Sequence, residues 1–503
     1  MFYEYLANNG YDRVLERVPY QHPEFTQKNE DKVFEYLYDI VHCNKKTLIE
    51  GDYDVDGLMC IMVLTSMFRT LGMTNYDIHH YKSRTHTLDP YAMHECLQGH
   101  YEYFIIGDTG SSDMDMLRVI ARAGVKIIVL DHHNTDYDYE SYPENVAIIN
   151  TMIENRLLLK DYYQLSAGAL CYCVAAKFSH LYYKTDLVKE SAYALTSLYA
   201  DCMEMSSELN RSIYWRATSL REAELPSYLR HFMNDYTVFG RRYIDFWYSP
   251  RINALFRSDH NELINTYFFA ENNSIALAKC IEMVNKIYES NRQLVAKASD
   301  IVQVTEFSNF VFSDLGSLNE FIPIDSNKMY NYTGLIANRL SDRYNKIAVV
   351  ICQTASSYKG SVRDKFGRKI LPMFQRIGYA NGHNAAFGFT VNLFDLDKFM
   401  AMLKAFDQSA TKIARLQSVV EICDEIVPNA KLISDMALYN DFSGGATPVA
   451  YLRKEMVGLE KVYSLYGYRY KWGDFSIQSN NPIEYGESLL LKPIKKRTVT
   501  LVL

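Results

Sequence analysis

The chain has 503 residues, of which 48% are hydrophobic and 22% charged, and its formal net charge is −7. This length exceeds that of one typical core, so we expect about two to four domains of ordinary globular composition. The negative net charge argues against a surface that binds nucleic acid everywhere, and any such binding needs a local groove. Nine scattered cysteines, with no run approaching about 18 apolar residues, predict reduced thiols in a cytoplasmic protein without a membrane span.

Residues 1–45 are polar with helical spacing and are predicted to form an N-terminal helical cap. From about 46 to 150, short apolar runs alternate with helical stretches, and this alternation predicts βαβ units and a parallel sheet. The clearest helix in this part is 57–71, a strongly apolar stretch that begins shortly after the first apolar run. We therefore expect an α/β fold whose first sheet lies within residues 46–150.

Acidic residues follow three of the apolar runs, at 47–50, 103–106 and 125–130. Because the carboxyl ends of strands in an open parallel sheet meet along one edge, these residues are expected to converge on one crevice. Carboxylate and imidazole ligands suit Mn²⁺, Mg²⁺ or Zn²⁺, and two such ions about 3.5–4 Å apart are a common device for displacement at phosphorus. The pattern therefore predicts metal-dependent hydrolysis of a phosphodiester. The residues concerned are Asp52, Asp54 and Asp56 after the first run, Asp108 after the second, and Asp131, His132 and His133 after the third.

Two simpler explanations of these acids are a calcium-binding loop and helix N-caps. The segment 52–57 fits the first half of a calcium-binding EF-hand loop, but the twelfth position is Val63 rather than a bidentate Glu, and the preceding segment is a predicted strand. A helix N-cap would explain Asp56 or Asp108 singly. It would not call for three acids at alternate positions or for paired histidines after Leu130.

The middle of the chain has a mainly helical pattern over residues 165–265, including the apolar stretch 192–200 that Asp201 follows. Residues 274–304 lack Pro and Gly and carry apolar residues at helical spacing, which predicts a long helix connecting two domains.

A second α/β pattern follows this connector, with a predicted helix at 333–344 and a predicted strand at 346–353. After a further helix near 396–420, the last eighty residues are rich in Tyr, Val and turn residues. That composition predicts a mostly β C-terminal region.

The motifs, taken in order, resemble those of the DHH phosphoesterases, and within them the RecJ-like single-strand-specific exonucleases. Residues 51–57 are similar to the first motif of that family, Asp108 to the second, Asp131-His132-His133 to the third, and residues 195–201 to the fourth.

Further segments are similar to RecJ in particular. Residues 249–254, with Arg257 after them, resemble the RecJ segment Pro-Arg-Ile-Asn-Ala, and residues 208–211 resemble another. Residues 360–363 and the Gly382-His383 segment resemble the DHH-associated substrate domain.

The resemblance implies an α/β fold in which a parallel-sheet DHH catalytic domain is joined by a long helix to a smaller α/β DHH-associated domain. The predicted parts are the helical cap at 1–45, the catalytic domain at 46–272, the connector helix at 273–305, the substrate-binding domain at 306–405 and a mostly β, OB-like region at 406–503.

The resemblance also implies roles for individual residues. One or two ions of Mn²⁺ or Mg²⁺ are expected, with Asp52 and Asp131 as ligands or close orienters. The resemblance implies a catalytic role for Asp131, His132 and His133; metal binding by Asp52, Asp54, Asp56, Asp108, His132 and Asp201; and substrate binding by Arg251, Asn253, Arg257, Ser361, Arg363, Gly382 and His383.

The chain departs from the family pattern at three positions. Glu50 stands where many members have His, Asn381 stands where Gly usually precedes Gly-His, and Phe256 stands where RecJ usually has Gly before Arg257. These departures concern the fit of the substrate more than the metal chemistry.

The function implied by the resemblance is 5′-to-3′ degradation of single-stranded DNA to mononucleotides in recombination, repair or replication. A helicase or a single-strand-binding protein would be a fitting partner. Two alternatives stay open: a phosphodiesterase for short oligonucleotides or cyclic dinucleotides, and a non-catalytic replication or repair scaffold.

Overall fold

The structure is a computed structural model, and it divides into two compact units, residues 1–252 with 418–503 and residues 253–417. The predicted limits of the five domains stay predictions. The structure describes residues 2–8, 13–80, 87–158, 164–234, 237–258, 260–269, 274–318, 329–364, 370–383, 386–409, 419–423, 430–442, 449–455, 460–462, 468–472, 475–479, 488–495 and 498–502.

The first unit contains a five-stranded sheet in the order β2-β1-β3-β4-β5, with every neighbouring pair parallel. All but the short edge strand β2 are almost continuously buried, as expected for a parallel sheet covered on both faces. The register aligns the carboxyl ends of the three central strands, because Gly51 pairs with Gly107 and Gly107 with Leu130. The strands are β1 (Thr47–Gly51), β2 (Tyr76–Ile78), β3 (Tyr103–Gly107), β4 (Lys126–Asp131) and β5 (Val146–Asn150).

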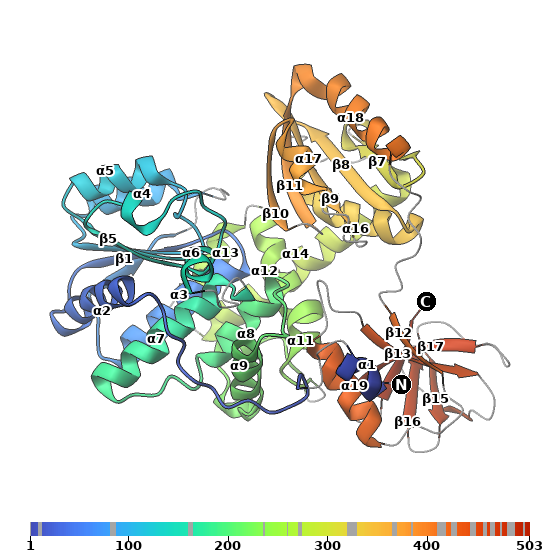
Figure 1. Ribbon diagram of the computed structural model, residues 1–503, viewed down its shortest axis with the longest axis horizontal. Helices are drawn as coiled ribbons and strands as arrows, with labels where there is room; N and C mark the ends of the chain where they lie inside the picture. Colours follow the sequence, from blue (N-terminus) through green and yellow to red (C-terminus); the bar gives the residue numbers. More distant parts are fainter. Residues whose placement is uncertain are drawn as a thin grey trace. The chain divides into compact units, whose positions relative to one another are not determined.

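Helices cover both faces of this sheet (Figure 1). On one face α4 and α5 share a core with the strands, and on the other α2, α3 and α7 contact them. The predicted α/β fold is confirmed. The helical elements of this unit are α1 (Phe2–Asn8), α2 (Gln27–His42), α3 (Val55–Thr70), α4 (Pro90–Gln98), α5 (Met114–Arg122), η1 (Tyr139–Ser141), α6 (Thr151–Leu158), α7 (Ala167–Tyr183), α8 (Ser191–Ala200), α9 (Glu208–Thr218), η3 (Glu222–Glu224), α10 (Ser227–Arg230), α11 (Arg241–Tyr243) and η4 (Ile244–Tyr248). Helix α12 (Ser249–Arg257) continues into the second unit.

The second unit is built on a six-stranded mixed sheet in the order β10-β11-β9-β8-β7-β6, in which only the β7–β8 pair is parallel among the described strands. One core joins this sheet to α14 and α16, and another joins it to α17 and α18. Its elements are α13 (Asn261–Phe269), α14 (Ser274–Ile301), β6 (Thr305–Glu306), β7 (Phe310–Asp314), η5 (Leu315–Leu318), η6 (Tyr330–Tyr332), α16 (Thr333–Tyr344), β8 (Ile347–Gln353), β9 (Ser357–Arg363), α17 (Leu371–Gln375), β10 (Tyr379–His383), β11 (Ala386–Asn392), η7 (Leu393–Asp395) and α18 (Leu396–Ser409).

The described residues in the C-terminal part of the first unit form a seven-stranded mixed sheet in the order β12-β13-β17-β18-β16-β15-β14 and the helix α19, so the mostly β prediction for this part is confirmed. The OB-like assignment stays a prediction. None of the described helices is long and apolar enough to cross a lipid bilayer. The elements are β12 (Val419–Cys423), α19 (Ala430–Phe442), β13 (Val449–Glu455), β14 (Glu460–Val462), β15 (Tyr468–Trp472), β16 (Phe475–Ser479), β17 (Ser488–Lys495) and β18 (Thr498–Val502).

Candidate metal centre

The turn between β1 and α3 places three acids at the carboxyl end of the sheet. The Asp54 side chain caps α3 by accepting from the backbone N–H of Asp56 at 2.8 Å and of Gly57 at 3.1 Å. The turn is too tight for a side chain at Gly57, because a Cβ there would lie 2.2 Å from the backbone nitrogen of Asp52. Gly57 is therefore needed for the chain to bring the three acids so close together.

Asp56 is fixed by two elements that lie far from it in the sequence. Its carboxylate accepts from the N–H of Ala167 at 2.9 Å and of Gly168 at 2.8 Å, at the N-terminus of α7, and from the hydroxyl of Ser197 on α8. Burial, together with the charges of Asp201 and Asp54, raises the pKa of Asp56 to about 8. These acids therefore repel one another unless a cation lies among them.

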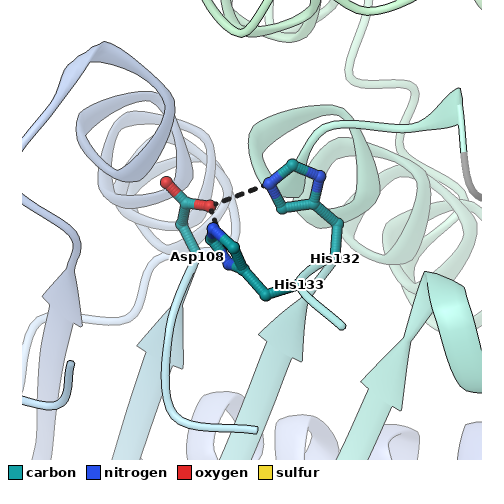
Figure 2. Close-up of side chains that lie close together, drawn as sticks. All are labelled: Asp108, His132 and His133. Atoms are coloured by element: carbon teal, nitrogen blue, oxygen red, sulfur yellow. Dashed lines mark ion pairs between the residues drawn. The ribbon is translucent and has the colours of Figure 1, made fainter. Parts of the chain in front are cut away.

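Asp108 and the paired histidines meet at the ends of β3 and β4 (Figure 2). The Asp108 Oδ1 atom lies 3.3 Å from His132 Nε2 and 3.9 Å from His133 Nδ1. No described residue donates a hydrogen bond to this oxygen, although it is buried. Burial and the charges of the neighbouring carboxylates raise the pKa of Asp108 well above its usual range. A buried carboxylate with this environment is a suitable ligand for a divalent ion.

Asp201 joins the same site from the C-terminal end of α8. The His132 Nε2 atom lies 3.6 Å from an Asp201 oxygen and 3.7 Å from an Asp56 oxygen. Among the described residues, three groups have ligand atoms within 4.8 Å of one another, and they share members: Asp108, His132 and His133; Asp56, His132 and Asp201; and Asp52, Asp54 and Asp108. Five carboxylates and two imidazoles thus form one continuous ligand set that fits one or two divalent ions.

Asp131 is not a member of these groups of described residues, and its carboxylate contacts the His133 ring and three backbone N–H groups instead. Its carboxylate accepts from His133 Nδ1 at 2.8 Å, from the backbone N–H of His132 at 2.7 Å and from that of Ser111 at 3.2 Å. Burial alone would raise the pKa of Asp131, but these hydrogen bonds and the charge of His133 lower it below its usual range. Burial opposes protonation of His133, but Asp131 outweighs it and raises the pKa of His133 to about 10.

Comparison with known proteins gives this site a family. Residues 46–205 match the model of the DHH family, N-terminal domain. Residues 46–205 are a DHH domain. This match confirms the resemblance that the order of the motifs predicted. A search of curated proteins finds no relative of the chain.

Solved structures share the fold of the DHH domain and of most of the chain. RecJ of Thermus thermophilus in complex with Mn²⁺ is 15% identical, with a TM-score of 0.73, covering 99% of this chain and 74% of the RecJ chain. The same RecJ in complex with Mg²⁺ is 14% identical, with a TM-score of 0.66, and the match covers 99% of this chain and 73% of the RecJ chain. An exonuclease RecJ bound to manganese is 17% identical, with a TM-score of 0.58, covering 78% and 97%. At these identities the comparison establishes a RecJ-like fold.

Glu50 of the DHH domain, which departs from the family pattern, is hydrogen-bonded to a residue outside the ligand set. Its Oε1 atom accepts from the backbone N–H of Asp89 at 2.8 Å, and burial raises its pKa well above its usual range. It belongs to no group of metal-ligand atoms among the described residues. The sequence showed that Glu50 replaces the usual His. It did not show the hydrogen bond of Glu50, because the donor lies 39 positions away in the chain.

The predicted substrate-binding residues lie in both units, and each set is described in its own unit. Arg251 lies in the first turn of α12, in the first unit, whereas Asn253 and Arg257 lie further along the same helix, in the second. The backbone carbonyl of Arg257 accepts from the Asn331 side chain at 3.0 Å. Phe256 is buried, so the aromatic residue that replaces the usual Gly is part of a packed interior.

In the second unit, Ser361 and Arg363 lie on β9, while Gly382 and His383 lie on β10, with β11 between these strands. The Ser361 hydroxyl is 2.9 Å from that of Thr333, which opens α16. Their roles in binding substrate stay predictions.

Sequence reasoning did not single out Ala167, Gly168 and Ser197 as site residues. The two backbone amides have no side-chain signal, and Ser197 lies in the fourth motif but was not assigned a role. A Cβ at Gly168 would lie 2.7 Å from the Ser197 hydroxyl. This close approach allows the α7 N-terminus and Ser197 to bind the same carboxylate.

Proposed function

We propose that the protein is a divalent-metal-dependent phosphodiesterase that hydrolyses single-stranded DNA as a 5′-to-3′ exonuclease, releasing mononucleotides in recombination, repair or replication. The observation that supports the proposal most is the continuous set of five carboxylates and two imidazoles at one edge of the sheet. The RecJ-like fold along the chain supports the substrate class.

The residues that would hold Mn²⁺ or Mg²⁺ are Asp54, Asp56, Asp108, His132 and Asp201, with Asp52 beside them. Such ions, when bound, polarise a phosphoryl oxygen and lower the pKa of water toward neutrality. The α7 amides hold the Asp56 carboxylate in place and favour its ionised form, although burial and the neighbouring acids raise its pKa to about 8.

His133 has a separate task in this proposal. Asp131 raises the pKa of His133 to about 10, which favours the cationic imidazole over the neutral form that a metal ligand needs. The imidazole lies beside Asp108, where it can pair with a negatively charged phosphate oxygen. Asp131 acts as its positioning residue. Arg251 and Arg363 can bind further phosphates because a guanidinium grips two phosphate oxygens at once.

The test is digestion of a single-stranded DNA of about 40 nucleotides with Mn²⁺, labelled at the 5′ end in one sample and at the 3′ end in another. We expect immediate release of the 5′ label as a mononucleotide and delayed loss of the 3′ label. Asp108→Asn should abolish release. Asp115→Asn, in the following helix α5, should leave it unchanged because the Asp115 side chain is exposed and outside the ligand set.

Other results would favour the alternative functions. Hydrolysis of dinucleotides or cyclic dinucleotides without action on the long strand would identify a short-substrate phosphodiesterase. Inactivity on both, with no Mn²⁺ bound, would identify a scaffold. A helicase or a single-strand-binding protein stays a predicted partner of the exonuclease.

A further inference from the structure

Two aromatic side chains are exposed on the helix that passes through α11, η4 and α12. Residues 241–257 are helical without interruption, but 244–248 form a π-helical turn. Such turns within an α-helix are rare and frequently occur at functional sites. Here Tyr248 is buried, whereas Phe246 and Trp247 are 67% and 44% exposed. The turn thus presents two neighbouring rings to solvent.

A guanidinium group lies against one of these rings. The Arg251 Cζ atom is 5.1 Å from the centre of the Trp247 ring and 5.4 Å from that of Phe232. The same group donates to the backbone carbonyl of Trp247 at 2.7 Å, which holds it beside the ring. Arg242, which precedes Phe246 on the same helix, is exposed. The surface therefore combines aromatic faces with positive charge, although the chain as a whole is negative.

This surface is separate from the metal centre but is connected to it through α8. The turn η4 contacts α8, whose last residue precedes Asp201. The Arg241 guanidinium lies 5.7 Å from the ring of Tyr199, two positions before Asp201. Phe246, Trp247 and Arg242 belong to neither the ligand set nor any of the motifs, whereas Arg251 lies in the RecJ-like segment 249–254.

We infer that Trp247 and Phe246, with Arg251 and Arg242, form a stacking platform for bases of single-stranded nucleic acid away from the scissile phosphate. The inference rests on the proposed function and adds a binding site to it. Every base has an aromatic face, so stacking on Trp247 tolerates any sequence, and the arginines can pair with the phosphates between stacked bases. The positive charge favours a polyanion over an apolar segment of another protein as the occupant.

Fluorescence tests this binding without catalysis. The chain has three tryptophans, Trp215, Trp247 and Trp472. In EDTA, which prevents digestion, oligo(dT) of about 20 nucleotides should quench the emission of the unmodified protein. Most of that quenching should be lost in Trp247→Phe. A base can still stack on the phenylalanine ring, but that ring does not contribute to the tryptophan emission. Oligo(U) should quench as well, since stacking does not read the sugar.

Affinity measurements give the second test. Trp247→Ala should weaken binding of oligo(dT) about 5- to 150-fold, the range for the loss of one stacked base. Because Trp247 is partly exposed, we expect Trp247→Ala to fold. Its circular dichroism spectrum and melting temperature check this. Tyr182→Ala is the matched control. Tyr182 is 48% exposed and lies at the C-terminal end of α7, whereas Asp56 binds the N-terminal end of that helix. Its removal should leave the affinity unchanged.

Substrate length separates this inference from the proposed function. With Mn²⁺, Trp247→Ala should raise the KM for the long strand and leave dinucleotide hydrolysis unchanged, because a dinucleotide does not extend beyond the metal centre. If Trp247→Ala binds and digests the long strand like the unmodified protein, the platform is refuted while the exonuclease stands. If the unmodified protein neither binds nor digests single strands, both are refuted.

Discussion

At the residue scale, the ligand set depends on neutral groups that hold its carboxylates in place. The Ser197 hydroxyl donates to Asp56 and is itself within hydrogen-bonding reach of the Ser166 hydroxyl. Asp56 therefore presents its remaining lone pairs in a fixed direction. Outer groups of this kind commonly contribute about 10- to 100-fold to metal affinity.

We expect Ser197→Ala to weaken Mn²⁺ binding by at least about tenfold, because Asp56 loses the hydrogen bond that orients it. Titration calorimetry of the metal-free protein measures this. The control is Thr196→Val, which removes an adjacent buried hydroxyl that donates to the carbonyl of Ala192 within the same helix. Equal Mn²⁺ affinity in the two variants would show that Ser197 has no orienting role.

A second residue-scale network anchors the loop that carries the first three acids. The Tyr53 hydroxyl donates to Asp89, and His79 lies between Asp89 at 3.3 Å and Glu95 at 2.7 Å. Burial raises the pKa of Asp89, but the hydrogen bonds from His79 and Tyr53 outweigh it and lower that pKa. A carboxylate whose pKa is lower in the folded than in the unfolded chain stabilises the fold. This stabilisation is complete at pH values above the unfolded pKa of about 3.9, and it is lost as pH falls through the folded pKa.

Tyr53→Phe should therefore lower the free energy of unfolding at pH 7 by about 1.5–3 kcal/mol, because a buried carboxylate loses a donor. At acid pH the difference from the unmodified protein should shrink as pH falls through the folded pKa of Asp89, since a protonated Asp89 no longer gains from the Tyr53 hydrogen bond. Urea unfolding in EDTA at the two pH values measures both quantities. A difference that stayed constant with pH would mean that the lost hydrogen bond does not depend on the charge of Asp89.

At the element scale, the β1–α3 turn and the aligned strand ends determine where the acids lie. The sequence predicted this edge of the sheet because apolar runs followed by acids require no tertiary information. It could not predict that α7 would bind Asp56, since Ala167 lies 111 residues away and contributes only a backbone N–H. Nor could it predict the direction of Glu50, which depends on Asp89. Local pattern thus located the candidate ligands, and long-range packing determined their orientation.

Gly57→Ala tests the tightness of this turn. Its Cβ would lie 2.2 Å from a backbone nitrogen that cannot move without displacing Asp52, so we expect a loss of more than about 2 kcal/mol of unfolding free energy. The comparison variant is Gly72→Ala, at the other end of α3. Gly72 has φ of +80° and open space around it. Gly72→Ala should therefore lose only the about 1–2 kcal/mol of unfolding free energy that a left-handed backbone costs an alanine. Urea unfolding in EDTA distinguishes the two, and similar losses would argue against a steric limit at Gly57.

At the scale of the whole molecule, the chain consists of two compact units, and the ligand set lies entirely in the first. The sequence predicted that more than one domain was present. It did not predict that residues 418–503 would join the first 252 in one unit, because no motif links segments so far apart. The α19 helix makes this link: the Asp441 side chain accepts from the Tyr214 hydroxyl at 3.2 Å, and Phe442 packs edge-to-face on the Tyr214 ring.

Metal binding should therefore stabilise the two units unequally. A ligand that binds only the folded state stabilises it by about 2.7 kcal/mol at one hundred times its dissociation constant. We expect saturating Mn²⁺ to raise the calorimetric transition of the first unit and to leave that of residues 253–417 at its metal-free temperature. Asp108→Asn should remove the shift, whereas Asp115→Asn should retain it. A shift of equal size in every transition would show that the two units unfold together, and a shift that survived Asp108→Asn would place the stabilising ion outside the ligand set.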